Sequence, residues 1–109
     1  MDFLPTAYDA MLNGVVDINS DAAYPVRCGS SNLGTRKWLW IHNASKQPVF
    51  IGSVFLVSGV RTTITAKALG KNGLKMAAGD ERWFPVTNNI TVYARSNSGS
   101  ARLRVMELG

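Results

Sequence analysis

Turn-forming residues interrupt the chain at short intervals from Tyr24 onward, and this punctuation limits the folds that the chain can adopt. Glycine, asparagine, serine and proline gather in clusters, and the runs between the clusters are rich in β-branched and aromatic residues. Short strands bounded by such clusters are typical of antiparallel sandwiches and small barrels. The runs are Arg36–His42, Val49–Val57, Arg61–Ala66, Arg82–Val86, Ile90–Arg95 and Ala101–Leu108. The sequence therefore predicts an all-β domain over residues 24–109, either a single compact antiparallel β-sandwich (jelly-roll or immunoglobulin-like) or a small barrel.

Alternation of side chains along the last two runs assigns their faces, because successive residues of a strand point to opposite sides of a sheet. Ile90–Arg95 and Ala101–Leu108 are joined by the short turn Ser96–Ser100 and are predicted to form a hairpin. Arg102 and Arg104 are expected to point outward. The residues expected to point inward are Ile90, Val92, Ala94, Ala101, Leu103 and Val105.

The run Arg36–His42 carries large apolar residues on both faces. Trp38 and Trp40 share one face, and Leu39 and Ile41 share the other. Strands that are apolar on both sides are covered on both sides. We therefore place the two tryptophans at the boundary between the core and a subunit interface.

The first 23 residues have a different residue pattern from the rest, and they are predicted to form an N-terminal arm and linker. Several apolar residues are spaced roughly as one face of a short helix: Phe3, Leu4, Tyr8, Met11, Leu12 and Val15. Pro5 suits the start of such a helix, and Asn13 followed by Gly14 suits its end. A helix this short is unstable alone, so the arm is expected to dock on its own body or on a neighbouring subunit.

Charge divides the chain near the same place. Residues 1–26 contain four aspartates and no lysine or arginine, whereas residues 27–109 contain all 12 basic residues against Asp80, Glu81 and Glu107. The whole chain carries a formal net charge of +5. An acidic arm on a basic body provides electrostatic register for docking between neighbours. A basic body also attracts nucleic acid non-specifically.

The inventory of reactive residues argues against an enzyme, a metal site and a cofactor. The chain has one cysteine, Cys28, one histidine, His42, and seven scattered acids, whereas zinc sites and catalytic triads need several such groups at defined spacing. A lone cysteine fits a reducing cytoplasm. No apolar run reaches the roughly 20 residues of a membrane-spanning helix, and the first residues lack the pattern of a secretory signal. A length of 109 residues gives room for one domain.

A set of basic and aromatic residues could form a binding face. Such a face would stack bases and neutralise phosphates of single-stranded nucleic acid. Because tryptophan and arginine are enriched at protein interfaces, it would equally serve a subunit interface. With the tryptophans as sugar platforms, a carbohydrate- or receptor-binding tail module is a further alternative. The residues are Arg36, Lys37, Trp38, Trp40, His42, Tyr93, Arg95, Arg102 and Arg104.

The order of strands and turns in the second part of the chain resembles that of small structural proteins of tailed bacteriophages. The segments that carry the resemblance are Ile41–Gly52, Asn72–Gly79, Ile90–Ser96 and Ala101–Leu108. They resemble the patterns N-x-S-x-x-x-V-x-I-G, N-G-x-x-L-x-x-G, V-Y-A-x-S and V-x-V-x-E. Met76 or Leu74 stands for the central apolar residue of the second pattern, and Leu103 stands for the first valine of the last. The resemblance spans roughly residues 38–108. Proteins of this kind include capsid decoration (cement) proteins and head–neck and tail components.

The resemblance implies a compact sandwich that is a non-enzymatic part of a virion and is made in the cytoplasm of a bacterial host. Its partners would be the major capsid protein or neck and tail subunits, together with further copies of itself; nucleic acid is the less favoured partner, and no membrane is expected. No catalytic, cofactor-binding or metal-binding residues follow from it. The residues predicted to bind partners are Phe3, Leu4, Tyr8, Met11, Leu12, Trp38, Trp40, Arg102 and Arg104.

Overall fold

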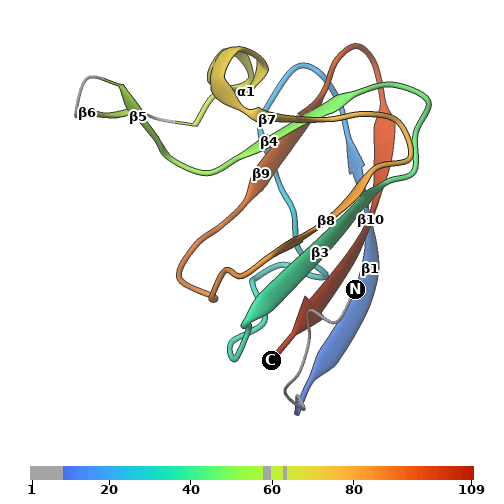
Figure 1. The fold of residues 1–109 in the computed structure, drawn as a ribbon, viewed down its shortest axis with the longest axis vertical. Helices are drawn as coiled ribbons and strands as arrows, with labels where there is room; N and C mark the ends of the chain where they lie inside the picture. Colours follow the sequence, from blue (N-terminus) through green and yellow to red (C-terminus); the bar gives the residue numbers. More distant parts are fainter. Residues whose placement is uncertain (1–8, 58–59, 63) are drawn as a thin grey trace.

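The computed structural model describes residues 9–57, 60–62 and 64–109 and is an antiparallel β-sandwich of two four-stranded sheets (Figure 1). This confirms the predicted all-β sandwich. The first sheet has the strand order β1 (Met11–Ile18), β10 (Ala101–Leu108), β3 (Trp38–Asn43), β8 (Glu81–Phe84). The second sheet has the order β2 (Tyr24–Pro25), β9 (Tyr93–Ser96), β4 (Val49–Gly52), β7 (Leu74–Met76).

The segment between β4 and β7 differs from its prediction. The run Val49–Val57 is divided into β4 and β5 (Phe55–Val57), and β5 pairs with β6 (Val60–Thr62) in a ribbon that projects to the left in Figure 1. The predicted strand Arg61–Ala66 ends at Thr62, and Ala66 begins the helix α1 (Ala66–Asn72). The helix starts there because the Thr65 hydroxyl accepts the N–H of Ala68 and caps its first turn.

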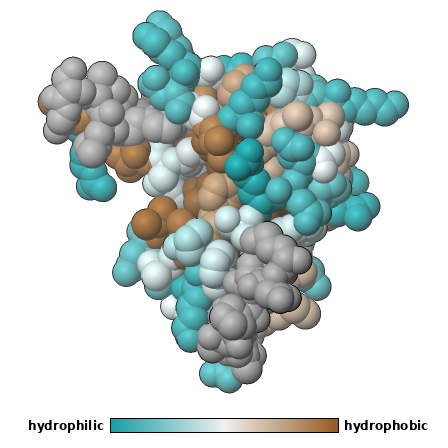
Figure 2. All heavy atoms as spheres, in the orientation of Figure 1, coloured by the Kyte–Doolittle hydropathy of each residue, from teal (hydrophilic) through white to brown (hydrophobic). Residues whose placement is uncertain are grey.

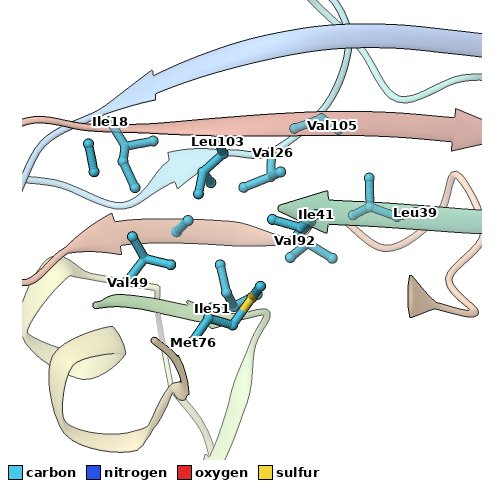
Figure 3. Close-up of a cluster of buried hydrophobic side chains, with 12 residues drawn as sticks. Ile18, Val26, Leu39, Ile41, Val49, Ile51, Met76, Val92, Leu103 and Val105 are labelled. Carbon is cyan, nitrogen blue, oxygen red and sulfur yellow. The ribbon is translucent and has the colours of Figure 1, made fainter. Parts of the chain in front are cut away.

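The core lies between the two sheets and draws on both (Figure 3). The inward positions of β3 and β10 agree with the predicted alternation. Side chains that are at most 2% exposed come from the first sheet (Leu39, Ile41, Leu103, Val105) and from the second (Val49, Ile51, Met76, Ala94). Burying one such aliphatic side chain stabilises the fold by about 1.5–3 kcal/mol.

β9 and β10 do not pair, so the predicted hairpin is wrong. β9 lies between β2 and β4 in the second sheet, whereas β10 lies between β1 and β3 in the first. The turn between them carries the chain from one sheet to the other; Gly99 adopts φ 62°, and the Ser96 hydroxyl donates to the Gly99 carbonyl. The predicted inward residues still reach the core. Strands of two stacked sheets bury alternate side chains between the sheets, just as two paired strands bury alternate side chains on one face. Ile90 is the exception and is exposed.

The N-terminal segment is a strand, not a helix, over the residues that are described. Met11–Ile18 pairs antiparallel with β10, from Met11 opposite Leu108 to Ile18 opposite Ala101. Glycine and the adjacent β-branched pair Val15 and Val16 disfavour a helix, and β10 offers a strand of equal length. Ile18, expected in a linker, is a core residue, so the chain enters the sandwich before residue 24. The predicted arm residues Phe3, Leu4 and Tyr8 lie outside the described residues.

Candidate binding surface

The outward side of the first sheet, which we call the tryptophan face, carries the aromatic residues of β3 and β8. Trp38, Trp40 and His42 alternate with the buried residues of β3 and are themselves partly exposed. The register of β8 places Trp83 opposite Trp40, with their ring centroids 6.3 Å apart. Trp83 also meets Trp38 edge-on at 6.2 Å, and His42 stacks on Trp40 at 5.9 Å. The strands thus hold a continuous aromatic surface.

The tryptophan face continues over β10 and β1. Arg104 lies opposite both Val15 and His42, while the next outward residue of β10, Met106, lies opposite Trp40. A depression of about 440 Å³ lies in this region, lined by Asn13, Gly14, Val15, Trp40, Arg104, Val105 and Met106. Its lining, which is mostly apolar with one guanidinium and one amide, suits an apolar group that stands beside a negative charge.

The two sheets differ in what covers their outward sides. α1 packs against β4 and β9 of the second sheet, and Arg95 of β9 donates to the Ala66 carbonyl of α1. Among the described elements, no helix or strand packs in this way on the tryptophan face. A space-filling view shows hydrophilic side chains along the upper right (Figure 2). Val60 of β6 is 66% exposed.

An exposed ion pair lies at one end of the tryptophan face. Arg102 Nε donates to Asp17 Oδ1 at 2.9 Å, and the two side chains are 61% and 68% exposed. The hydrogen bond lowers the pKa of Asp17 and raises that of Arg102. Arg102 was predicted to bind partners; here its charge is already neutralised by a residue of the neighbouring strand.

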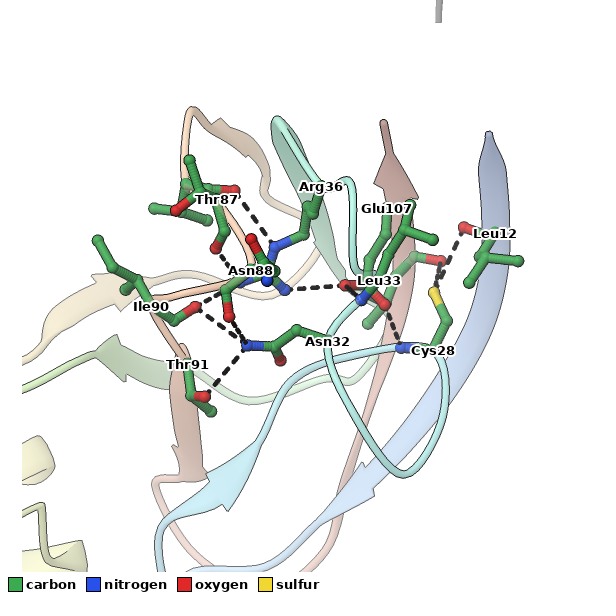
Figure 4. A network of polar contacts seen from close by, with 12 residues as sticks. Leu12, Cys28, Asn32, Leu33, Arg36, Thr87, Asn88, Ile90, Thr91 and Glu107 are labelled. Atoms are coloured by element: carbon green, nitrogen blue, oxygen red, sulfur yellow. Dashed lines mark hydrogen bonds and ion pairs between the residues drawn. The ribbon is translucent and has the colours of Figure 1, made fainter. Parts of the chain in front are cut away.

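A second ion pair is buried at the opposite end of the sandwich (Figure 4). Arg36 Nη1 donates to Glu107 Oε2 at 2.9 Å, and neither side chain is exposed. The same guanidinium donates to the carbonyls of Val86, Thr87 and Ile90. Arg36 was grouped by sequence with the outward basic residues. The structure corrects this placement, because Arg36 precedes β3 and turns inward to tie three segments together.

The carboxylate of Glu107 is fully paired. Besides Arg36, it accepts the backbone N–H of Cys28 at 2.8 Å and that of Leu33 at 3.0 Å. Burial by itself raises the pKa of Glu107, but these N–H groups and the guanidinium outweigh burial and hold the pKa below its usual value. Glu107 therefore stays ionised inside the protein at neutral pH.

The thiol of Cys28 lies beside this carboxylate. Burial, followed by the negative charge of Glu107, raises the pKa of Cys28 to about 11. The sulfur donates to the Leu12 carbonyl at 3.3 Å. A Cβ added to Gly14 would approach Cys28 Cα to 3.3 Å, so a residue without a side chain lets β1 lie against this loop. A protonated, hydrogen-bonded thiol is a poor nucleophile.

The structure brings together part of the predicted partner-binding set. Trp38, Trp40, Arg102 and Arg104 lie on the tryptophan face with Met11, whereas Leu12 points to the other side of β1. Tyr93 and Arg95 belong to the second sheet. Sequence reasoning missed Trp83, which lay in the predicted run Arg82–Val86. The sequence signal available for Trp83 was its outward position in that run. Its pairing with Trp40 could not be predicted in the same way, because the two residues lie far apart in the sequence.

Neither a metal-binding cluster nor a membrane-spanning helix occurs in the described part of the chain. No group of three or more His, Cys, Asp or Glu side chains is placed there to hold a metal ion. Within the same residues, no helix has the length and apolar character needed to cross a membrane.

The comparisons with known proteins assign no family to the chain. No family model matches it, and no curated protein matches it. A solved structure described by the words "Bacillus endospore appendages form a novel family of disulfide-linked pili" aligns over 99% of this chain and 98% of that chain, with 18% sequence identity and a TM-score of 0.34. A likeness of this degree supports no statement about fold or function.

Proposed function

We propose that the chain is a non-enzymatic structural subunit of a tailed-phage virion, a capsid decoration or head–neck component that binds other virion proteins through its tryptophan face. The observation that carries the proposal is that three tryptophans lie together on a sheet face that no described helix or strand covers. Tryptophan and arginine are the residues most enriched in the energetic centres of protein interfaces. The resemblance of residues 38–108 to small phage structural proteins supports the virion as the setting.

The positions of the reactive residues support a non-enzymatic role. Cys28 lies on the inner side of the first sheet, with its pKa raised to about 11. His42 lies on the outer side and stacks on Trp40. A nucleophile and its base must be within hydrogen-bond reach of each other, and the sheet separates these two side chains.

The test is the number of copies of the chain in purified virions of the phage that encodes it. We expect Trp40→Ser to lower this occupancy by about tenfold or more, because a buried interface tryptophan contributes about 2 kcal/mol or more. Ile90→Ser is the matched control, since Ile90 is an exposed apolar residue outside the tryptophan face. Urea unfolding of both variants checks that they fold. Virions without the chain, or equal occupancy by Trp40→Ser and wild type, would contradict the proposal.

Single-stranded nucleic acid is the second candidate partner, because Arg104 and His42 lie beside Trp40 on an open face of a chain with a net charge of +5. The probe is a fluorescent oligothymidine, whose anisotropy is followed from low to moderate salt. If the tryptophan face binds it, affinity falls steeply with salt and Arg104→Gln reduces the slope. Binding that does not change with salt, or no binding, removes this candidate.

A further inference from the structure

The four edges of the two sheets are protected to very different degrees. Edge strands present unpaired backbone groups, and natural proteins block them with short length, proline or charged side chains. β2 is two residues long and includes Pro25; β7 is three residues long and carries the exposed Lys75; β8 carries the exposed Glu81 and Arg82. β1 is eight residues long and contains no lysine, arginine or proline. Its one charged residue, Asp17, is paired with Arg102 of the adjacent strand.

Within the described part of the chain, the outer edge of β1 has a defined stretch without backbone partners. Ala10 and Gly109 exchange both of their backbone hydrogen bonds. Bonding residues alternate along an antiparallel pair, so the N–H and C=O groups of Met11, Asn13, Val15 and Asp17 point away from β10. The next group in this series, the Asn19 carbonyl, accepts the N–H of Ser96. The open stretch therefore runs from residue 11 to residue 17.

Three exposed side chains along this stretch are apolar. Met11 is 60% exposed, Val15 56% and Leu12 43%. Unpaired backbone groups next to exposed apolar side chains are the features that β-strand addition uses, with main-chain hydrogen bonds for affinity and side chains for register.

We propose that β1 pairs antiparallel with β1 of a second copy of this chain, about a two-fold axis at Gly14, and so joins two first sheets into one. The partner is a second copy for two reasons. Among the described strands, β1 is the one with a long unprotected edge, so a second copy supplies the edge that pairs with it. A two-fold contact also uses the same surface on both copies. This inference goes beyond the proposed function and does not depend on it.

One register pairs every open group of the stretch. With the axis at Gly14, Met11 lies opposite Asp17 of the second copy, and Asn13 lies opposite Val15 of the second copy. The two copies of Asp17 then do not lie opposite each other. Like charges in directly opposite positions would destabilise the pairing. On the inner side the two copies of Gly14 meet where strands approach most closely, and glycine has no side chain to obstruct them. The two tryptophan faces become one continuous surface.

The experiment measures the mass of the full-length chain by sedimentation equilibrium. We expect a dimer of twice 11.8 kDa. Asn13→Pro removes an N–H that points to the open edge and leaves the bonds to β10 intact, and Val15→Lys places a charge there; each should raise the dimer dissociation constant about tenfold or more. The controls are Asn13→Ala, which keeps the N–H, and Ile90→Lys, which adds the same charge at an exposed residue elsewhere. Circular dichroism confirms folding of each variant, and Val15→Lys keeps the test decisive if the proline variant does not fold.

Cysteine cross-linking tests the register. We expect a disulfide when an Asn13→Cys chain is mixed with a Val15→Cys chain; cross-linking of the Val15→Cys chain mainly with itself overturns the register. A monomeric wild-type chain, or a dimer that both edge variants leave intact, overturns the β1–β1 pairing. If that intact dimer is lost on deletion of residues 1–8, exchange of residues 1–8 between copies is the explanation of the dimer instead. All of these measurements use the isolated chain, so their failure is distinct from a failure to find the chain in virions.

Discussion

β10 carries an ion pair on each of its faces, and the two pairs have the same geometry in opposite surroundings. The nitrogen–oxygen distance is 2.9 Å both in Arg36–Glu107 and in Arg102–Asp17. The first pair has no exposed side-chain surface and the second is mostly exposed. The buried pair also collects five further hydrogen bonds from or to the backbone (two to Glu107, three from Arg36).

The comparison teaches that distance does not set the contribution of an ion pair to stability. In an exposed pair, each charged group exchanges contacts with water for contacts with its partner, so the net gain in stability is small. A buried pair has lost its water, so each partner depends on the other, and removal of one leaves an uncompensated charge inside the protein. The buried pair also joins loops from distant parts of the chain. We therefore expect the two ends of β10 to respond very differently to the same kind of change.

The largest effect is expected from Arg36→Met, which keeps much of the side-chain volume but removes the charge. Glu107 then remains buried without its cation, and the carbonyls of Val86, Thr87 and Ile90 lose their donor. We expect the free energy of unfolding in urea to fall by about 3–5 kcal/mol. Arg104→Met is the control, because Arg104 is an exposed arginine on the same strand as Glu107. A loss within the error of that control would show that the loops hold together without the pair.

Reactivity of Cys28 reports on the buried end of β10. With a pKa of about 11 in the fold against 9.0 for a free thiol, the thiolate fraction at pH 9 should be roughly fifty-fold lower in the native chain than in urea. A chromogenic disulfide reagent measures this ratio. Glu107→Gln should raise native reactivity, because the adjacent negative charge is gone, whereas Asp17→Asn should leave it unchanged. Equal effects of the two substitutions would contradict the link between Cys28 and Glu107.

Acid should destabilise the protein through Glu107. Its folded pKa lies below the usual 4.5, so the unfolded chain binds more protons as the pH falls. The contribution of Glu107 is complete above about pH 5 and is lost as the pH falls through the folded pKa. Urea titrations from pH 6 to pH 3 should show a decline in stability that is shallower in Glu107→Gln. An unchanged slope in that variant would assign the decline to other carboxyl groups.

The smallest effect is expected from Asp17→Asn, at the exposed end. The pair with Arg102 is screened by water and salt, so the urea midpoint should not change measurably. Dilute protein keeps any self-association out of the measurement. A shift that resembles that of Arg36→Met would mean that exposure does not distinguish the two pairs.

The sequence predicted what depends on local alternation. Ala101–Leu108 is a strand with the expected boundaries, and Arg102 and Arg104 point outward as predicted. The side of a strand that is buried follows from its own residues, so Trp38 and Trp40 were also assigned to a common face correctly.

What the sequence did not predict depends on partners far along the chain. Met11–Ile18 is a strand because β10 pairs with it, although the apolar spacing suggested a helix. β9 and β10 are neighbours in sequence but not in a sheet. Arg36 and Glu107 meet across 71 positions, and no local pattern marks one charge for burial and another for the surface. Tertiary context decided each of these cases.

The position of β10 has a consequence for biosynthesis. This strand separates β1 from β3 at the centre of the first sheet, yet its residues are made after all of the others in that sheet. Once residues 1–100 have emerged from the ribosome, the chain can complete the second sheet, but it holds β1 and β3 apart with nothing between them. Pairing across so long a stretch of chain is slow. The vacant place beside β3 is then open to β10 of a completed copy, so the chain is exposed to strand exchange until its own β10 has emerged from the ribosome.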